Sequence, residues 1–496
     1  MMDGDGWRHA GASDAVESRP PLPHQREPEP EPWRPMPPSG SHAHGEAYRE
    51  PPPAPRDATF FRVVLVAALA LLLLAPTAAI AYTTVRSGRP TVMAGQELPG
   101  DGGYGVEGPR GPGEPASPAA GRSASPGASH RPAPTTVAGK IRLALESQGA
   151  ALLAGDEDAF LAVVDPSAAV LREDLARRFG SLRQLQVKLW HPVPEGRPKT
   201  EAGGTATVNI LVTYCFVVAT CDPMALRTTT RWNVSGRSPT LLEFGVAKDL
   251  GPRPWEISEL RSAVGARVVM STTTRYASRL PSMLAIAEKA AALTDTFARW
   301  GEPPARYVVY LAGPDEWSAW YGIKQEPWVA GFALPLTATV TEIVLNASRV
   351  DAKQTLDVLR HEFTHVVTLA GVEKAYDQTW WLVEGIAEYA RVKGGGKPFD
   401  GLGAVRAYVR GGHWKNEIAM DNPPDGSSTA DVSGRYGVAY LSLQRLADRF
   451  GEDRLLDFFD YAARQGLALG DAAPKAFGVS WDDVEADCVR TVRGRV

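Results

Sequence analysis

Apolar and polar residues follow three different patterns along the 496-residue chain. Residues 1–59 and 84–137 show no apolar periodicity and are rich in proline, glycine or serine, so we expect a disordered tail and a disordered linker. Residues 60–83 contain the uncharged apolar run Val63–Tyr82. From residue 138 onward, apolar positions recur with the spacing of helices or strands, which predicts folded structure.

The uncharged run predicts a single transmembrane helix over residues 60–83. About 20 apolar residues in a helix span the hydrocarbon layer of a membrane. A secretory signal peptide is the rival interpretation, because Ala79-Ile80-Ala81 has the spacing of a cleavage site. The segment before the run is far longer than the usual n-region of a signal peptide. An uncleaved anchor is therefore favoured, and cleavage stays open.

Basic residues near this span favour a cytoplasmic N-terminus. More arginines lie close before the span than after it: Arg49, Arg56 and Arg62 against Arg86 and Arg89. Cytoplasmic flanks carry the larger share of positive charge in membrane proteins. We therefore expect a single-pass protein of the cell membrane, with a cytoplasmic proline-rich tail and extracytoplasmic C-terminal domains.

Residues 138–262 combine helical spacing with strand-like runs. Apolar residues from Ile141 to Val164 recur at helical spacing, and strand-like runs follow at 185–190, 205–217 and 226–234. Helices followed by a curved antiparallel sheet give an α+β order, which resembles the NTF2-like fold. That fold often carries a cone-shaped pocket. Because no convergent polar cluster is evident, we expect a spacer or a substrate-presenting domain.

Residues 263–496 start a second pattern of strands and helices. Strands are predicted at 267–270, 307–311 and 341–345, with a long amphipathic helix at 280–300. Another helix is predicted over 351–371, where Asp351 is the N-cap and Gln354 completes a capping box. A further helix is predicted over 439–450. This order predicts a second α+β domain.

The helix predicted over 351–371 contains His361-Glu362-Phe363-Thr364-His365, an H-E-x-x-H motif. Residues four apart lie on one helix face, so His361 and His365 can bind one Zn²⁺ ion. Glu362 lies beside them and can act as general base toward a zinc-activated water. The motif therefore predicts a zinc hydrolase site.

A second motif lies downstream at Trp380–Tyr389, with the sequence W-W-L-V-E-G-I-A-E-Y. Together the two motifs resemble the gluzincin superfamily of zinc metallopeptidases, in its peptidase MA-like branch. The resemblance implies that Glu384, 19 positions after His365, is the third zinc ligand. It also implies that Glu388, one helical turn later, orients a ligand histidine. The other interpretation of Glu388 is a solvated carboxylate on the helix surface.

The same resemblance implies a tyrosine that stabilises the transition state. In the gluzincins this residue lies some 50 to 65 positions after the third ligand, and here Tyr436 and Tyr440 lie in that window. The spacing of the family favours Tyr436, and Tyr440 is then a packing residue. A donor at this point meets the charge of the tetrahedral intermediate.

The sequence departs from the gluzincin aminopeptidases in one respect. The G-x-M-E-N strand that binds a free amine is absent, and Gly331-Phe332-Ala333-Leu334-Pro335 stands in its place. An edge strand there can still hold an extended peptide by β-augmentation. The resemblance implies a small mixed sheet and a mostly helical active-site half. The expected fold class is therefore α+β throughout: a gluzincin-type domain at 263–496, after an NTF2-like domain at 138–262 and an N-terminal transmembrane helix.

Composition and charge exclude one class of function. The chain has 53 basic and 57 acidic side chains and a net charge of −4, so we expect no nucleic-acid partner, which would need a basic surface. The three cysteines are Cys215, Cys221 and Cys488. Cys215 and Cys221 can form a local disulfide in an oxidising compartment. Cys488 would then be unpaired or buried.

These patterns predict a membrane-anchored, extracytoplasmic zinc metallopeptidase with one zinc ion per chain and a peptide or protein substrate. Glu362 takes a proton from the attacking water and returns it to the leaving amine. The alternative is a non-catalytic cell-surface binding module that retains a peptidase-like zinc domain. The intact Glu362 argues against this alternative, because a pseudoenzyme needs no general base. Substrate and endo- or exopeptidase specificity stay open.

Overall fold

The computed structural model describes residues 135–323, 329–372, 379–393, 399–424 and 427–496. These residues belong to one compact unit. The predicted tail and transmembrane helix lie outside the described residues, and so does the predicted linker apart from 135–137. In the part of the chain that is described, no helix is long and apolar enough to cross a membrane.

The first domain, residues 135–258, places helices before a sheet. Its first helix begins where the Thr136 hydroxyl accepts a hydrogen bond from Gly139 N, and it ends at Gly155 in the left-handed region. The helices are α1 (Val137–Ala154), α2 (Glu157–Leu161), α3 (Ala169–Gln184) and α4 (Pro254–Ile257). The antiparallel strands lie in the order β1 (Val187–Glu201), β2 (Thr205–Phe216), β3 (Met224–Asn233), β4 (Thr240–Phe244). The domain is α+β, and its kinship with the NTF2-like fold stays a prediction.

The cysteines have the arrangement that the sequence allows. Cys215 at the end of β2 forms a disulfide with Cys221, and Cys488 is buried and free. The disulfide closes a short turn beside the sheet. The rest of the first domain depends on its apolar core.

The second domain contains a mixed five-stranded sheet. Its strands are β5 (Leu260–Val264), β6 (Val268–Thr273), β7 (Tyr307–Ala312), β8 (Gly331–Pro335) and β9 (Thr341–Asn346). Their order is β5-β6-β7-β9-β8, with β6, β7 and β9 parallel and the two edge strands antiparallel. Strand β5 therefore straddles the boundary expected at residue 262. Strand β8 lies at the sheet edge, as its sequence suggested.

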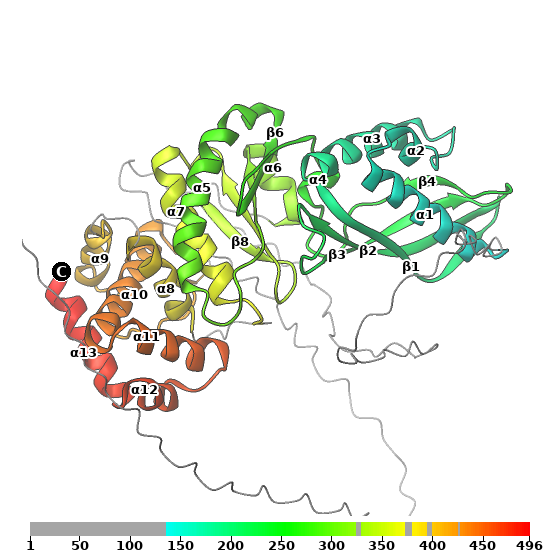
Figure 1. Cartoon of the computed structure of the whole chain (residues 1–496). Helices are drawn as coiled ribbons and strands as arrows, with labels where there is room; N and C mark the ends of the chain where they lie inside the picture. The colour runs from blue at the N-terminus through cyan, green and yellow to red at the C-terminus, as the bar shows by residue number, and fades with distance from the viewer. Residues whose placement is uncertain (1–134, 324–328, 373–378, 394–398, 425–426) are drawn as a thin grey trace, which may run out of the picture. The chain divides into compact units, whose positions relative to one another are not determined.

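Helices complete the second domain. Helix α5 (Leu280–Thr294) and helix α7 (Ala352–Thr368) share one core with a face of the sheet, and Figure 1 shows both beside its strands. The other helices are α6 (Pro314–Ala319), α8 (Trp380–Lys393), α9 (Leu402–Arg410), α10 (Thr429–Phe450), α11 (Glu452–Phe459), α12 (Leu469–Phe477) and α13 (Trp481–Arg495). Those from α8 onward form the mostly helical part of the domain (Figure 1).

Helices α5 and α10 differ most from their predicted extents, and α7 ends at Thr368 rather than at 371. Helix α5 ends at Thr294 rather than at 300, because the chain tightens into a 3₁₀ turn at Asp295–Phe297. Helix α10 begins at Thr429 rather than at 439, and it continues through Gly434 and Gly437. A Cβ atom on Gly434 would lie 2.2 Å from the Cβ of Tyr408 in α9. These glycines permit close helix packing and do not end the helix.

Candidate metal centre

Helix α7 carries both histidines of the H-E-x-x-H motif on a buried face. The helix begins with the predicted capping box: the Asp351 carboxylate accepts from Lys353 N and Gln354 N, and the Gln354 side chain accepts from Asp351 N. The exposed fractions of His361 and His365 are 0% and 2%. Their rings lie 4.8 Å apart between centroids. The cap and the buried face together fix both imidazoles on consecutive turns.

Helix α8 brings Glu384 to the two histidines. Oε2 of Glu384 lies 3.2 Å from Nε2 of His361 and 3.6 Å from Nε2 of His365. All three residues are buried, and one ligand atom from each lies within 4.8 Å of the others. These atoms have no hydrogen-bond partner among the described residues. Buried polar atoms without partners are rare in folded proteins and need an explanation.

The donor set fits a zinc ion. Two ligand atoms at about 2.0–2.1 Å from a tetrahedral zinc lie about 3.3–3.4 Å apart, and the distances from Glu384 to the two imidazoles fall on either side of that value. Two imidazoles and one carboxylate are ligands that zinc accepts in catalytic sites, where a fourth position is left open. His361, His365 and Glu384 are thus suited to hold one zinc ion.

Glu388 fixes the orientation of the His361 ring. Its Oε1 lies 2.8 Å from Nδ1 of His361, and its Oε2 accepts hydrogen bonds from Nε and Nη2 of Arg391 at 3.0 and 2.8 Å. A carboxylate only accepts, so Nδ1 of the ring carries a proton, and Nε2 is the nitrogen left to bind a metal once it is deprotonated. Glu388 is 2% exposed, which excludes the interpretation as a solvated surface carboxylate.

Glu362 lies on α7 between the histidines and strand β8. Its carboxylate is fully buried, and no side chain of the described residues hydrogen-bonds to either oxygen. Burial raises the pKa of Glu362 to about 8, against the opposing effects of His361 and of the Ala333 backbone. A cation at the adjacent ligands would lower that pKa, because an opposite charge favours the ionised form.

The two ligand histidines and Glu388 have shifted pKa values. Burial disfavours charge on His361, but the adjacent carboxylates of Glu384 and Glu388 outweigh burial and raise its pKa to about 10. Burial lowers the pKa of His365 despite the nearby Glu384. Burial also opposes ionisation of Glu388, but Arg391 and His361 together lower its pKa to about 2. Without a metal, the site therefore keeps a proton on His361 at neutral pH.

Tyr436 reaches the same cluster from α10. Its ring centroid lies 6.1 Å from that of His361 and 5.2 Å from that of Trp380, which meets it edge to face. Burial and the carboxylates of Glu384 and Glu362 raise the pKa of Tyr436 well above its ordinary value, so the hydroxyl keeps its proton. Tyr440 instead stacks on Phe399 at 4.2 Å between centroids.

Close helix packing brings Tyr436 to the ligands. A Cβ atom on Gly385 would lie 2.6 Å from Cδ2 of Leu443 and 3.3 Å from the carbonyl oxygen of Ala439 in α10. Glycine directly after Glu384 therefore lets α8 approach α10. The approach places the ligand carboxylate and Tyr436 in one cluster.

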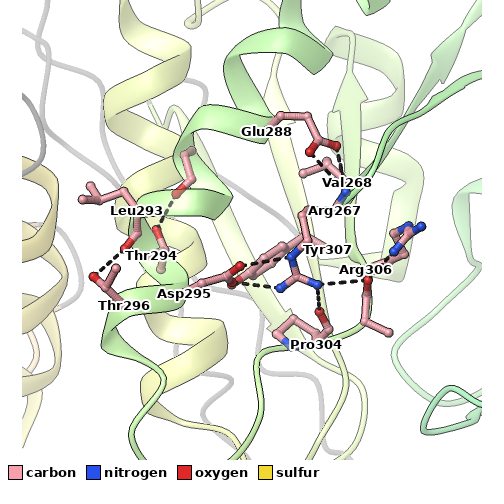
Figure 2. Close-up of polar contacts among 12 residues, drawn as sticks. Arg267, Val268, Glu288, Leu293, Thr294, Asp295, Thr296, Pro304, Arg306 and Tyr307 are labelled. Carbon is pink, nitrogen blue, oxygen red and sulfur yellow. Dashed lines mark hydrogen bonds and ion pairs between the residues drawn. The ribbon is translucent and has the colours of Figure 1, made fainter.

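A polar network supports α7 from the sheet. The Tyr307 ring stacks on Phe363 of the H-E-x-x-H motif at 4.1 Å between centroids. Figure 2 shows how Tyr307 is held: its hydroxyl donates to Asp295, which also accepts two hydrogen bonds from the Arg267 guanidinium. The Glu288 carboxylate of α5 accepts from the backbone N–H groups of Arg267 and Val268 (Figure 2). Phe363 thus packs on the ring of Tyr307, whose hydroxyl is held by Asp295.

The structure brings together His361, Glu362, His365, Glu384, Glu388 and Tyr436, the six site residues that the sequence suggested. Sequence reasoning missed Arg391, Gly385 and Trp380. Arg391 lies three residues after Glu388, a spacing at which helix side chains meet, so the i,i+3 rule applied to α8 would have found it. The roles of Gly385 and Trp380 could not be predicted from local spacing, because both residues act by packing against α10.

No model of a known protein family matches this sequence, and no curated protein is significantly similar to it. Among solved structures, a mutant M1 zinc metallopeptidase from Deinococcus radiodurans with bound Tyr-Ser-Ala substrate is 14% identical, with 63% of this chain and 62% of that chain covered and a TM-score of 0.28. A mutant two-domain M1 zinc metallopeptidase with bound L-arginine is 15% identical, with coverages of 62% and 61% and a TM-score of 0.28. The chain spans less than two thirds of either protein. The function is therefore inferred from the geometry of the site.

Proposed function

We propose that the chain is a zinc metallopeptidase of the gluzincin type that hydrolyses peptide bonds. The observation that carries the proposal is the convergence of His361, His365 and Glu384 beside the buried carboxylate of Glu362. The three ligand residues come from two helices, and their inward-facing ligand atoms lack partners among the described residues. Glu384 lies 3.2 and 3.6 Å from the two imidazole nitrogens, close to the spacing of ligands on tetrahedral zinc.

A zinc ion held by these three residues would supply a Lewis acid that lowers the pKa of water and polarises the scissile carbonyl. Glu362 accepts a proton from the attacking water and returns it to the leaving amine. Glu388 and Arg391 keep the His361 ring oriented. Tyr436 donates its hydroxyl hydrogen to the developing oxyanion.

Strand β8 is suited to bind the substrate. It lies at the edge of the sheet, and the backbone at Ala333 lowers the pKa of Glu362, so the two groups are neighbours. An extended peptide can add to such an edge through main-chain hydrogen bonds. The scissile bond would then lie beside the general base.

We also propose that the enzyme is anchored in the cell membrane by one span and faces outward. The disulfide between Cys215 and Cys221 supports an oxidising compartment for the first domain. The span itself rests on the apolar run Val63–Tyr82. Labelling with a membrane-impermeant reagent on intact cells tests this orientation: the C-terminal domains should be labelled, and protection of them would contradict it.

Metal analysis combined with a peptide-library digest tests the enzymatic proposal. The protein should contain about one zinc ion per chain, in line with a single site of three ligands. Hydrolysis should stop on removal of the metal with a chelator and return with added zinc. The Glu384→Ala variant should lose the metal. A protein without stoichiometric metal, or one that hydrolyses peptides equally well in chelator, would contradict the proposal.

A further inference from the structure

The face of the second sheet that lies away from α7 is buried and is not exposed to solvent. Side chains on this face, such as Val308, Tyr310 and Val344, belong to one apolar cluster with the first-domain residues Tyr214 and Trp255. Trp320 of the second domain donates a hydrogen bond from its indole to Ser258 at 2.9 Å. The first domain is therefore part of the core behind the candidate site.

Several charged or polar side chains are enclosed in this core, and we call three of them, Arg253, Tyr321 and Glu342, the interdomain lock. Each is at most 1% exposed. The Tyr321 hydroxyl donates to Oε2 of Glu342 on β9. The guanidinium of Arg253 lies 5.7 Å from the centre of the Tyr321 ring. Its own Nη1 donates to the carbonyl oxygens of Asp249 and Gly251.

The charges of the lock come from different domains. Glu342 is a fully buried carboxylate of the second sheet. Burial raises its pKa, whereas the hydrogen bond from Tyr321 and the charge of Arg253 lower it. The second sheet thus contains a buried carboxylate that is hydrogen-bonded to Tyr321, and the Tyr321 ring packs against the guanidinium of a first-domain arginine.

The two backbones are also in direct contact at the lock. Tyr321 has a φ of 62°, a strained value for a residue with a bulky side chain, and its N–H donates to Pro252 O at 2.7 Å. A Cβ atom on Gly251 would lie 2.4 Å from the carbonyl carbon of Tyr321. Such strain persists only where the surroundings fix the backbone. The first domain provides that constraint.

The lock lies directly behind the edge strand of the candidate site. Glu342 is the register partner of Leu334 in the β8–β9 ladder. The next residue, Ala333, is the one whose backbone acts on the general base Glu362. Leu334, which pairs with Glu342 of the lock, and Ala333, which lies beside Glu362, are therefore adjacent in β8.

We propose that the first domain is a brace for the substrate-binding edge, and that Arg253, Tyr321 and Glu342 are positioning residues that fix β8 against α7. The proposal rests on the proposed peptidase function for its catalytic consequence. The structural part of the proposal does not depend on that function. In it, the first domain is not a separable ligand-binding module, and the order of β8 and β9 depends on the first domain.

Hydrogen exchange and steady-state kinetics on the full-length chain test the brace. In Arg253→Met, amide exchange within 329–346 should accelerate about tenfold or more, because local opening of the edge becomes easier. KM for a peptide substrate should increase about tenfold with kcat nearly unchanged, the pattern of lost substrate binding. Bound zinc should stay at one per chain. The double variant Arg253→Met/Glu342→Gln should return much of the protection, because no ionisable carboxylate then stays buried without the arginine.

The matched control is Arg231→Met. Arg231 lies on the first-domain sheet and pairs with Glu243 at 2.9 Å, but its side chain is 40% exposed. This variant should change neither exchange in 329–346 nor KM. Tyr321→Phe removes only one hydroxyl and is the variant to use if Arg253→Met does not fold. It should accelerate amide exchange in 329–346 less than Arg253→Met does.

Two results overturn the brace: unchanged exchange in 329–346 for both Arg253→Met and Tyr321→Phe, or an equal acceleration in Arg231→Met. Failure of the peptidase function is distinguishable from either. If the wild-type protein hydrolyses no peptide, the catalytic proposal fails, and the exchange data alone decide whether the first domain holds the edge strand.

Discussion

Oε1 of Glu388 lies 2.8 Å from Nδ1 of His361, while Nε2 of the same ring lies 3.2 Å from Oε2 of Glu384. The imidazole is thus held between an orienting carboxylate on one side and a ligand carboxylate on the other. Arg391 completes the arrangement with two hydrogen bonds to Glu388. The relationship predicts that metal affinity depends on residues that do not contact the metal.

Glu388→Gln should weaken zinc binding about 10- to 100-fold, the usual cost of losing a partner that orients a ligand histidine. Arg391→Met should have a smaller effect in the same direction, because Glu388 would keep its bond to His361. Competition with a chromogenic chelator measures both affinities. Unchanged affinity in Glu388→Gln would show that the ring needs no such support.

Zinc binding should release a proton at neutral pH. The pKa of His361 is about 10 in the metal-free protein, so the ring is protonated below that pH, whereas a ligand imidazole must be neutral. Binding at pH 7 should release between one and two protons, because zinc displaces the proton of His361 and lowers the pKa of Glu362, which is about 8 without metal. Affinity should therefore increase at least about tenfold per pH unit between pH 7 and 9. Calorimetry in buffers of different ionisation enthalpy measures the release. In Glu388→Gln the pH dependence should be flatter, because one of the carboxylates that raise this pKa is gone.

Tyr436→Phe should lower kcat about 100-fold, the usual cost of losing one oxyanion donor, while KM and zinc content stay unchanged. Tyr440→Phe is the matched control, four residues further along α10. Because Tyr440 stacks on Phe399 through its ring, loss of its hydroxyl should leave kcat within about twofold. The reverse order of effects would assign the donor role to Tyr440.

Gly385→Ala should destabilise the fold by about 1–3 kcal/mol, since the added methyl group would meet Leu443 and separate α8 from α10. Gly180→Ala is the control: this exposed glycine lies inside α3 with no heavy atom within 4 Å of the new Cβ. That change should instead stabilise by about 0.5–1 kcal/mol. Denaturant unfolding measures both, and equal stability of the two variants would contradict the packing argument.

Local sequence signals accounted for much of the site. The capping box at Asp351 and Gln354 is confirmed, and α7 follows from it together with the buried face. The capping box could be predicted because its two residues lie three positions apart. The contacts of Glu384 and Glu388 with His361 join positions 23 and 27 residues apart, and only the gluzincin resemblance pointed to them.

The rest of the fold depends on contacts that have no local pattern. The start of α10 was missed because Gly434 and Gly437 look like helix breakers, although they serve packing against Tyr408 and Val405. The end of α5 was placed too late because Asp295 bonds Arg267, 28 residues earlier. Glu342 is buried in contact with Tyr321, whose ring packs against Arg253 from another domain. Such contacts become visible only once the chain is folded.

The most direct test of the central claim is the Glu362→Gln variant, assayed for zinc content and for peptide hydrolysis on the same preparation. The account predicts about one zinc per chain, as in the wild type, because Glu362 is not a ligand. It predicts that hydrolysis falls at least about 100-fold, because the general base is gone. Hydrolysis at the wild-type rate in the zinc-loaded variant would contradict the mechanism.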